Sequence, residues 1–255
     1  MSEAAPPPSA AWYVYGVVSA RTHPEGTGIG SRPVELVPEG NVAALVSAVP
    51  SEEFAEASLR ERLNDRAWLE RTAREHEETL ERVLARTPVI PFRLCTVYES
   101  REHVAEFLSA HGPALAGLLE RLDGRVELGV KAYFVAAAPE REEAQSGRDY
   151  LLRRQRERDE AEEATRFKAE CARASHESLA AAAEEARANP PQPPELSGRS
   201  DEMLLNGAYL VRRDDGRLAD AVAELEALYG ARGVTYEITG PWPPYNFVPS
   251  EVVGT

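Results

Sequence analysis

Short apolar runs alternate with one amphipathic stretch over the first hundred residues. WYVYGVV, from Trp12 to Val18, is rich in aromatic and β-branched residues, which predicts a strand. VELVPEGNVAALVSAV, from Val34 to Val49, predicts two short strands joined by a turn at Pro38–Gly40, which is a hairpin. Apolar positions then recur every three or four residues between Leu59 and Arg86, which predicts a helix. This stripe consists of Leu69, Ala73, His76, Leu80 and Val83.

The next apolar segments extend the pattern to about residue 137. PVIPFRLCTVY predicts a strand, a helix is expected from about Arg101 to Leu122, and VELGVKAYFV predicts another strand. With the hairpin set aside, the order β, ββ, α, β, α, β is close to the ferredoxin-like arrangement. We therefore expect residues 1–11 to be a disordered lead. Residues 12–137 should form a ferredoxin-like α/β domain, with a mainly antiparallel sheet and two helices on one face.

The second half of the chain is more polar. Residues 138–188 contain one long helix from Gly147 to about Ala188, which would span about 60 Å. Small and apolar residues at four-three spacing suggest a weak coiled-coil seam, pairing with the Leu59–Arg86 helix or with another subunit. The seam residues are Ala164, Phe167, Cys171, Ala174, Ser178 and Ala181. A proline-rich linker at 189–200 precedes a small α/β unit at 201–255, whose last strand should end near Gly240 because proline follows. The fold class is therefore α+β.

The stretch ITGPWPPYNF interleaves prolines with three aromatic residues, Trp242, Tyr245 and Phe247. Large aromatic side chains need an apolar environment, so they pack on the protein itself or bind a partner. One interpretation is an exposed polyproline II ligand, since Pro241 and Pro244 satisfy P-x-x-P. The other is an internal clasp that ties the C-terminal unit to the first domain. We favour the clasp because no basic residue flanks the motif and rigid residues lose little entropy when they pack.

Net charge and composition limit the classes of function that the chain can have. A formal net charge of −14 argues against binding to nucleic acid or to an anionic membrane surface. Two cysteines provide no disulfide framework, and we find no secretory signal and no apolar run of about 20 residues. We therefore expect a soluble cytoplasmic protein.

Residues typical of catalysis are scattered. The TGIG loop, with Gly26, Gly28 and Gly30, precedes Arg32–Pro33 instead of a helix, so it does not predict a phosphate cradle. The five histidines lack metal-ligand spacing, and His76 on its apolar stripe suggests a core residue. We expect no catalytic residue, no metal site and no cofactor.

Four segments together resemble a known family: WYVYGVV, HEETLERVLARTPVIPFRLCTVYES, VELGVKAYF followed by SGRDYLLRRQ, and NGAYLVRRDD leading into YEITGPWPPYNFV. This pattern resembles the gas vesicle proteins of the GvpF/GvpL family over nearly the whole chain. Family members more often have glycine where this chain has Cys95. That cysteine is therefore a departure which argues against a redox or ligand role.

The resemblance implies a non-enzymatic accessory or minor structural protein that binds the hydrophobic shell protein GvpA and other accessory Gvp proteins. It also implies a ferredoxin-like N-terminal domain and a helical, coiled-coil-bearing C-terminal part, located in the cytoplasm and at gas vesicles. An acidic protein with a restricted apolar face could mask such a shell protein in water. Two alternatives remain, a small-molecule-binding regulatory module on ferredoxin-like domains and a ferredoxin-like enzyme such as a cofactor-light oxygenase.

Overall fold

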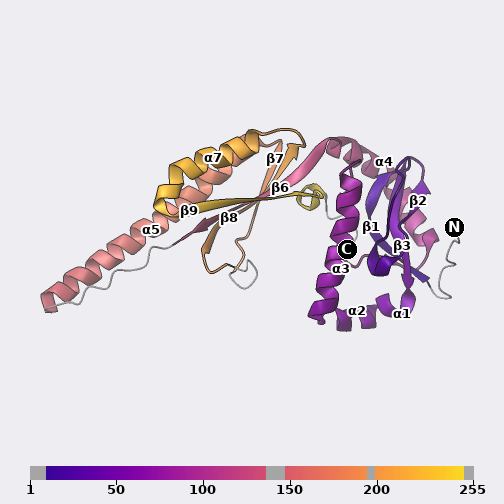
Figure 1. The fold of residues 1–255 in the computed structure, drawn as a ribbon, viewed down its shortest axis with the longest axis horizontal. Helices are drawn as coiled ribbons and strands as arrows, with labels where there is room; N and C mark the ends of the chain where they lie inside the picture. Colours follow the sequence, from indigo (N-terminus) through magenta and orange to yellow (C-terminus); the bar gives the residue numbers. More distant parts are fainter. Residues whose placement is uncertain (1–9, 136–146, 194–198, 250–255) are drawn as a thin grey trace. The chain divides into compact units, whose positions relative to one another are not determined.

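The protein consists of two compact units, and its chain leaves the first unit and later returns to it. The computed structural model describes residues 10–135, 147–193 and 199–249. Unit 1 comprises residues 1–126 and 242–255, and unit 2 comprises residues 127–241. Helices and strands are mixed in both units, which confirms the α+β class (Figure 1). Most of the expected disordered lead lies outside the described residues, and Ala10 and Ala11 already belong to the first strand.

The sheet of unit 1 is built around its first strand. Its strands are β1 (Ala10–Ser19), β2 (Glu35–Glu39), β3 (Val42–Pro50), β4 (Ile90–Pro91) and β5 (Val97–Tyr98). The strand order is β2-β3-β1-β4, and β5 also pairs with β1. The hydrogen-bonded pairs are antiparallel, and Glu39 pairs with Val42 at the end of the hairpin. The predicted antiparallel sheet and hairpin are therefore confirmed, but Pro38 lies within β2 and the turn is Gly40–Asn41 instead of Pro38–Gly40.

The two long helices of unit 1 lie against opposite faces of this sheet. The helices are α1 (Ser51–Phe54), α2 (Glu56–Arg62), α3 (Arg66–Leu84) and α4 (Arg101–Leu122). Tyr13 on β1 contacts His76 on α3, whereas the preceding residue, Trp12, lies under Arg101 of α4. Neighbouring residues of a strand point to opposite faces, so the expected arrangement of two helices on one face is wrong. The sequence signal was the continuous apolar run of β1, which is typical of a strand buried on both faces.

The predicted strand VELGVKAYFV does not complete the sheet of unit 1. It forms β6 (Arg125–Phe134), which belongs to the sheet of unit 2. The other elements of unit 2 are α5 (Gly147–Ala182), β7 (Glu185–Asn189), β8 (Glu202–Arg212), α7 (Arg217–Tyr229) and β9 (Val234–Trp242). Their order is β, α, β, β, α, β, and the sheet order is β7-β8-β6-β9, which is the ferredoxin-like arrangement. The ferredoxin-like domain expected at residues 12–137 is therefore wrong in its position, and this topology belongs to unit 2.

Two further boundaries differ from expectation. The long helix ends at Ala182, before the expected Ala188, because residues 185–189 pair with β8 as strand β7. Tertiary pairing has overridden the helix-favouring composition of EARAN. Strand β9 continues past Gly240 to Trp242. Proline is tolerated there because β9 is an edge strand of its sheet. The expected linker 189–200 lies partly outside the described residues, and Asn189 belongs to β7.

Among the side chains of α5 that the structure describes, the buried ones lie in the C-terminal half of the helix. Its buried residues recur every four positions and contact β8 and α7: Phe167, Cys171, Ser175 and Leu179. This spacing is one face of a straight helix on a sheet, so the four-three coiled-coil seam is not confirmed. Ala164, Ala174 and Ser178 of the expected seam are half-buried, and Ala181 is exposed.

Phe167 should stabilise the packed half of α5. Its ring lies 6.1 Å from that of Tyr229 and 6.4 Å from that of Phe134, and Arg232 covers its face. We expect Phe167→Ala to lower the free energy of unfolding by at least about 3 kcal/mol. The exposed neighbour offers a control, Arg166→Ala, which should stay within about 0.5 kcal/mol. Denaturant unfolding measures both, and equal small effects would show that this face of α5 is not packed.

Candidate functional site

The three aromatic residues of the C-terminal motif occupy different environments. Phe247 is 1% exposed, and Pro243 and Pro244 are also buried. Tyr245 is half-buried, whereas Trp242 at the end of β9 is 37% exposed. The structure therefore brings Tyr245 and Phe247 into unit 1 and leaves Trp242 partly accessible.

Tyr245 ends a chain of hydrogen bonds that runs through unit 1. Its hydroxyl donates to Oε1 of Glu77 at 2.8 Å and lies 3.2 Å from Nε2 of His76. Nδ1 of His76 lies 2.9 Å from the hydroxyl of Tyr13, which accepts the backbone N–H of Cys95 at 3.1 Å. Because the proton of Tyr245 points to Glu77, His76 must donate from Nε2 and accept from Tyr13 at Nδ1. A neutral imidazole satisfies every one of these contacts.

Burial sets the protonation of this hydrogen-bond chain. Desolvation lowers the pKa of His76 to about 4, so the ring is neutral at physiological pH. Desolvation also raises the pKa of Glu77. The hydrogen bond from Tyr245 lowers this pKa, but its effect is smaller than that of desolvation. Among the described residues, Oε2 of Glu77 is buried without a hydrogen-bond partner. A neutral His76 with both nitrogens bonded acts as an internal linker, which matches the core role expected from its apolar stripe.

A second contact fixes the same segment from the other helix. The guanidinium of Arg121, in the last turn of α4, donates to the backbone carbonyl of Phe247. Residues 243–248 are thus held by both long helices of unit 1. Sequence reasoning found Tyr245 and Phe247 but missed Tyr13, Glu77 and Arg121. A strand tyrosine and two charged helix residues carry no local signal of such contacts, and a histidine within an apolar stripe is the one signal that could have indicated them.

The backbone conformation of Cys95 explains why glycine is favoured at this position. Its φ is +64°, in the left-handed region that favours glycine. Burial raises the pKa of its thiol to about 11, so the thiol stays protonated and unreactive at neutral pH.

The TGIG loop uses its backbone donors within the protein. The N–H of Ile29 donates to the hydroxyl of Tyr15, and that of Gly30 donates to Oε2 of Glu75. A Cβ on Gly28 would come within 2.0 Å of the Tyr15 hydroxyl, so glycine is needed for this close approach. A carboxylate already occupies the position that a phosphate would need.

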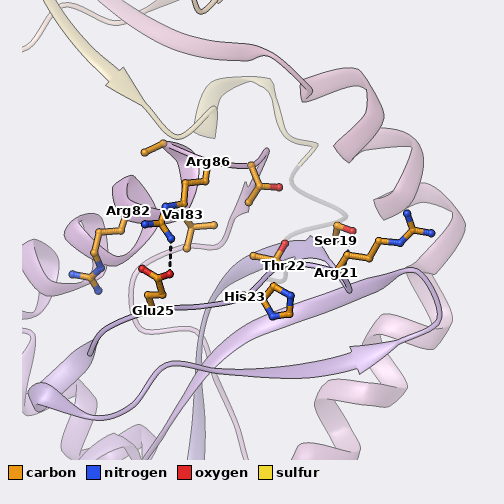
Figure 2. A pocket seen from close by; sticks show the side chains of 10 residues that line it. Ser19, Arg21, Thr22, His23, Glu25, Arg82, Val83 and Arg86 are labelled. Carbon is orange, nitrogen blue, oxygen red and sulfur yellow. Dashed lines mark hydrogen bonds and ion pairs between the residues drawn. The ribbon is translucent and has the colours of Figure 1, made fainter.

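A cavity of about 680 Å³ opens between the loop after β1 and the end of α3 (Figure 2). Its lining includes Arg21, His23, Glu25, Arg82 and Arg86. Arg86 forms an ion pair with Glu25 at 2.8 Å, which lowers the pKa of Glu25. Figure 2 shows the side chains of Arg21 and Arg82 pointing away from this pair, and Arg82 donates to the carbonyl of Thr27. The cavity could admit a carboxylate or phosphate, but its cationic groups do not converge on one point.

The described residues offer neither a cluster of metal ligands nor a helix suited to cross a membrane. Within residues 10–135, 147–193 and 199–249, no three His, Cys, Asp or Glu residues are grouped so that they could hold a metal ion. No helix in these ranges combines the length and apolar character that a membrane span requires.

Known proteins resemble this chain over nearly its whole length. The family model for gas vesicle synthesis protein GvpL/GvpF matches residues 11–249. Gas vesicle protein L of Streptomyces sp. (strain CB03234) is 39% identical over 251 residues, which cover 92% of this chain and 91% of that protein. Gas vesicle protein F2 of Halobacterium salinarum is 44% identical over 50 residues, which cover 19% of this chain and 22% of that protein.

Two crystal structures share the fold. GvpF from Anabaena sp. PCC7120 matches with a TM-score of 0.69 at 18% identity, over 94% of this chain and 96% of that protein. GvpF from Microcystis aeruginosa matches with a TM-score of 0.65 at 20% identity, over 93% of this chain and 98% of that protein.

The neutral His76 should make stability depend on pH. Its pKa is about 4 when folded against 6.5 when unfolded, so the unfolded state binds the proton more readily. This stability is fully present above pH 6.5 and is lost as the pH falls towards 4. Between pH 7.5 and 5 we expect His76 to account for a loss of about 2 kcal/mol in the free energy of unfolding. Glu77, whose pKa is raised, contributes with the opposite sign.

The matched variant is His76→Gln, which keeps a donor and an acceptor but does not titrate. Denaturant unfolding across this pH range should give a flatter dependence for the variant. An unchanged slope would mean that His76 is not held neutral by burial.

Proposed function

Because the chain belongs to the gas vesicle synthesis protein GvpL/GvpF family, we propose that it is a non-enzymatic accessory or minor structural protein of gas vesicles. In this role it binds the hydrophobic shell protein GvpA and other accessory Gvp proteins in the cytoplasm and supports vesicle assembly. The family match over residues 11–249 is the observation that carries the proposal.

The surface chemistry of unit 2 suits an apolar partner. Val135, Leu228 and Ile238 are 43%, 64% and 40% exposed. They offer apolar contact points on a chain whose net charge of −14 favours solubility. A shell protein exposes apolar surface before assembly, and contact with such side chains would remove part of it from water.

The chemistry of His76 supports a non-catalytic role. Both of its ring nitrogens face tyrosine hydroxyls, at 2.9 Å from Tyr13 and 3.2 Å from Tyr245. A general base needs a nitrogen within hydrogen-bond reach of a substrate proton. In this arrangement His76 positions protein groups and presents no free nitrogen.

For the C-terminal motif we favour the clasp, with residues 243–248 acting within unit 1. The burial of Phe247 and the contacts of Tyr245 with His76 and Glu77 support this role. Trp242, at 37% exposure, is then the one aromatic residue of the three that a partner could reach.

Shell-protein binding should depend on the apolar side chains of unit 2. We expect Leu228→Glu combined with Ile238→Glu to weaken binding of the cognate shell protein at least about tenfold, since a charge would enter an apolar contact. The control is Leu63→Glu, at an exposed leucine of unit 1, which should bind as the unaltered chain does. Co-purification measures the binding of each variant to the shell protein, in a buffer that contains a chelator and no nucleotide. A requirement for metal or nucleotide, or an equal loss in the control, would contradict the proposal.

Two single variants distinguish the clasp role of this segment from the ligand role. Phe247→Ala should lower the free energy of unfolding by about 3 kcal/mol or more and leave shell-protein binding intact below the melting temperature. Trp242→Ala should change stability by less than about 1 kcal/mol. Thermal unfolding and binding assays on the same samples decide the matter. If Phe247→Ala abolishes binding while the protein remains folded, the segment is a ligand.

A further inference from the structure

The cavity at the end of α3 is lined mainly by positive charge, although the chain as a whole is acidic. Arg21, Arg82 and Arg86 line it, and Glu25 is the one acidic residue among the described residues of its lining. The chain carries 43 acidic residues against 29 lysines and arginines. The volume of about 680 Å³ lies in the range of ligand pockets and exceeds what one carboxylate or phosphate fills. The cavity therefore has the charge and the room for a larger anionic ligand.

Contacts within unit 1 account for some of these cations and leave others unused. Arg82 donates to the carbonyl of Thr27, and a basic residue in the last turn of a helix also offsets the helix dipole. Arg21 and His23 lie on the loop after β1, where neither reason applies. Within the described part of the chain, neither of these two side chains has a hydrogen-bond or ion-pair partner. Both are exposed and can bind a ligand in the cavity.

The ion pair between Arg86 and Glu25 shows how a carboxylate binds in this cavity. The pair is 2.8 Å long, and the two side chains are 66% and 68% exposed. An exposed pair of this kind contributes little to stability, so an incoming carboxylate can replace Glu25 at Arg86. No backbone–backbone hydrogen bond joins residues 23–26 to another described residue. The loop that carries Glu25 can therefore give way to a ligand.

The spacing of the arginines suits an extended chain that carries several carboxylates. Arg82 and Arg86 are four residues apart at the end of α3, which is about one helical turn of 5.4 Å. Side chains on one face of an extended peptide repeat about every 6.6 Å, so two alternate carboxylates can each meet one guanidinium. In the view of Figure 2, Arg82 and Arg21 lie at opposite ends of the cavity, with Arg86 between them. A single small anion would reach one of these groups and leave the others without a partner.

We propose that this cavity binds an extended acidic segment of a partner protein. One carboxylate of the segment replaces Glu25 at Arg86, and another binds Arg21. The unpaired peptide groups of residues 23–26 provide backbone hydrogen bonds to the segment, as in other modes of extended-peptide recognition. The proposal uses none of the apolar residues of unit 2 that we assign to the shell protein.

Other charges limit where the acidic segment can lie. Arg21 also borders a second cavity of about 440 Å³, whose lining includes Glu120 and Asp123. These carboxylates would repel the ligand, so its acidic part is confined to the side of α3. The net charge of −14 opposes the approach of an anion from a distance. At physiological salt the Debye length is about 8 Å, so the arginines of the lining dominate once the segment is in contact.

Fluorescence anisotropy of a labelled octapeptide of alternating glutamate and serine tests the proposal. The peptide should bind the full chain at about 0.1 M salt, whereas a peptide of alternating glutamine and serine should not bind. At about 1 M salt the Debye length falls to about 3 Å, and the dissociation constant should rise at least about tenfold. Absence of binding at about 0.1 M salt would overturn the proposal. Displacement of the peptide by an equal concentration of inorganic phosphate would also overturn it, because the site would then bind single anions.

Three single variants and two controls locate the binding site. Arg21→Gln and Arg86→Gln should each weaken peptide binding at least about fivefold, since each removes one charged donor. Glu25→Gln should instead strengthen binding at least about threefold, because it removes the carboxylate that competes for Arg86. The controls repeat each charge change at exposed positions elsewhere in unit 1, with Arg71→Gln on α3 and Glu61→Gln on α2. Both controls should bind the peptide as the unaltered chain does.

Thermal unfolding of every variant should match that of the unaltered chain, since the substituted side chains are exposed. Equal effects of Arg21→Gln and Arg71→Gln, or a Glu25→Gln variant that binds no better than Glu61→Gln, would refute the site. Sedimentation of the same samples tests whether a second copy of the chain is the occupant. Self-association that Arg21→Gln abolishes would contradict a separate partner. These assays contain no shell protein, so their outcome is independent of the proposed function.

Discussion

The hydrogen bond between Nε2 of His76 and the hydroxyl of Tyr245 joins residues 169 positions apart. Unit 1 buries the His76 ring, and an unpartnered polar atom there would cost about 1–3 kcal/mol. Tyr245 supplies the partner from the segment of chain that returns to unit 1 after unit 2 is complete. In this sense unit 2 is an insertion between residue 126 and residue 242.

The topology of unit 2 fits such an insertion. The chain enters it through β6 and leaves through β9, and these strands are neighbours in its sheet. Adjacent first and last strands allow a domain to be inserted without stretching the chain between its ends. The ferredoxin-like strand order provides this adjacency, because the fourth strand pairs with the first.

Local signals in the sequence predicted elements well and their partners poorly. The hairpin between β2 and β3 and the limits of α4 follow from turn residues such as Gly40 and from the capping residue Ser100, which are local. The sheet to which β6 belongs, and the strand state of residues 185–189, depend on pairing with distant residues. The same limit applies to the candidate site. Aromatic residues near the C-terminus indicated a docking segment, but only the fold brings Tyr13 and Glu77 to it.

The central claim is that residues 243–248 belong to the core of unit 1 and that unit 2 carries the binding surface. Hydrogen–deuterium exchange with and without the shell protein tests this claim most directly. Backbone amides in residues 245–248 should exchange slowly in the free protein and should not change when the shell protein binds. New protection should appear on α7 and β9. Rapid exchange of residues 245–248 in the free protein, followed by protection on binding, would contradict this account.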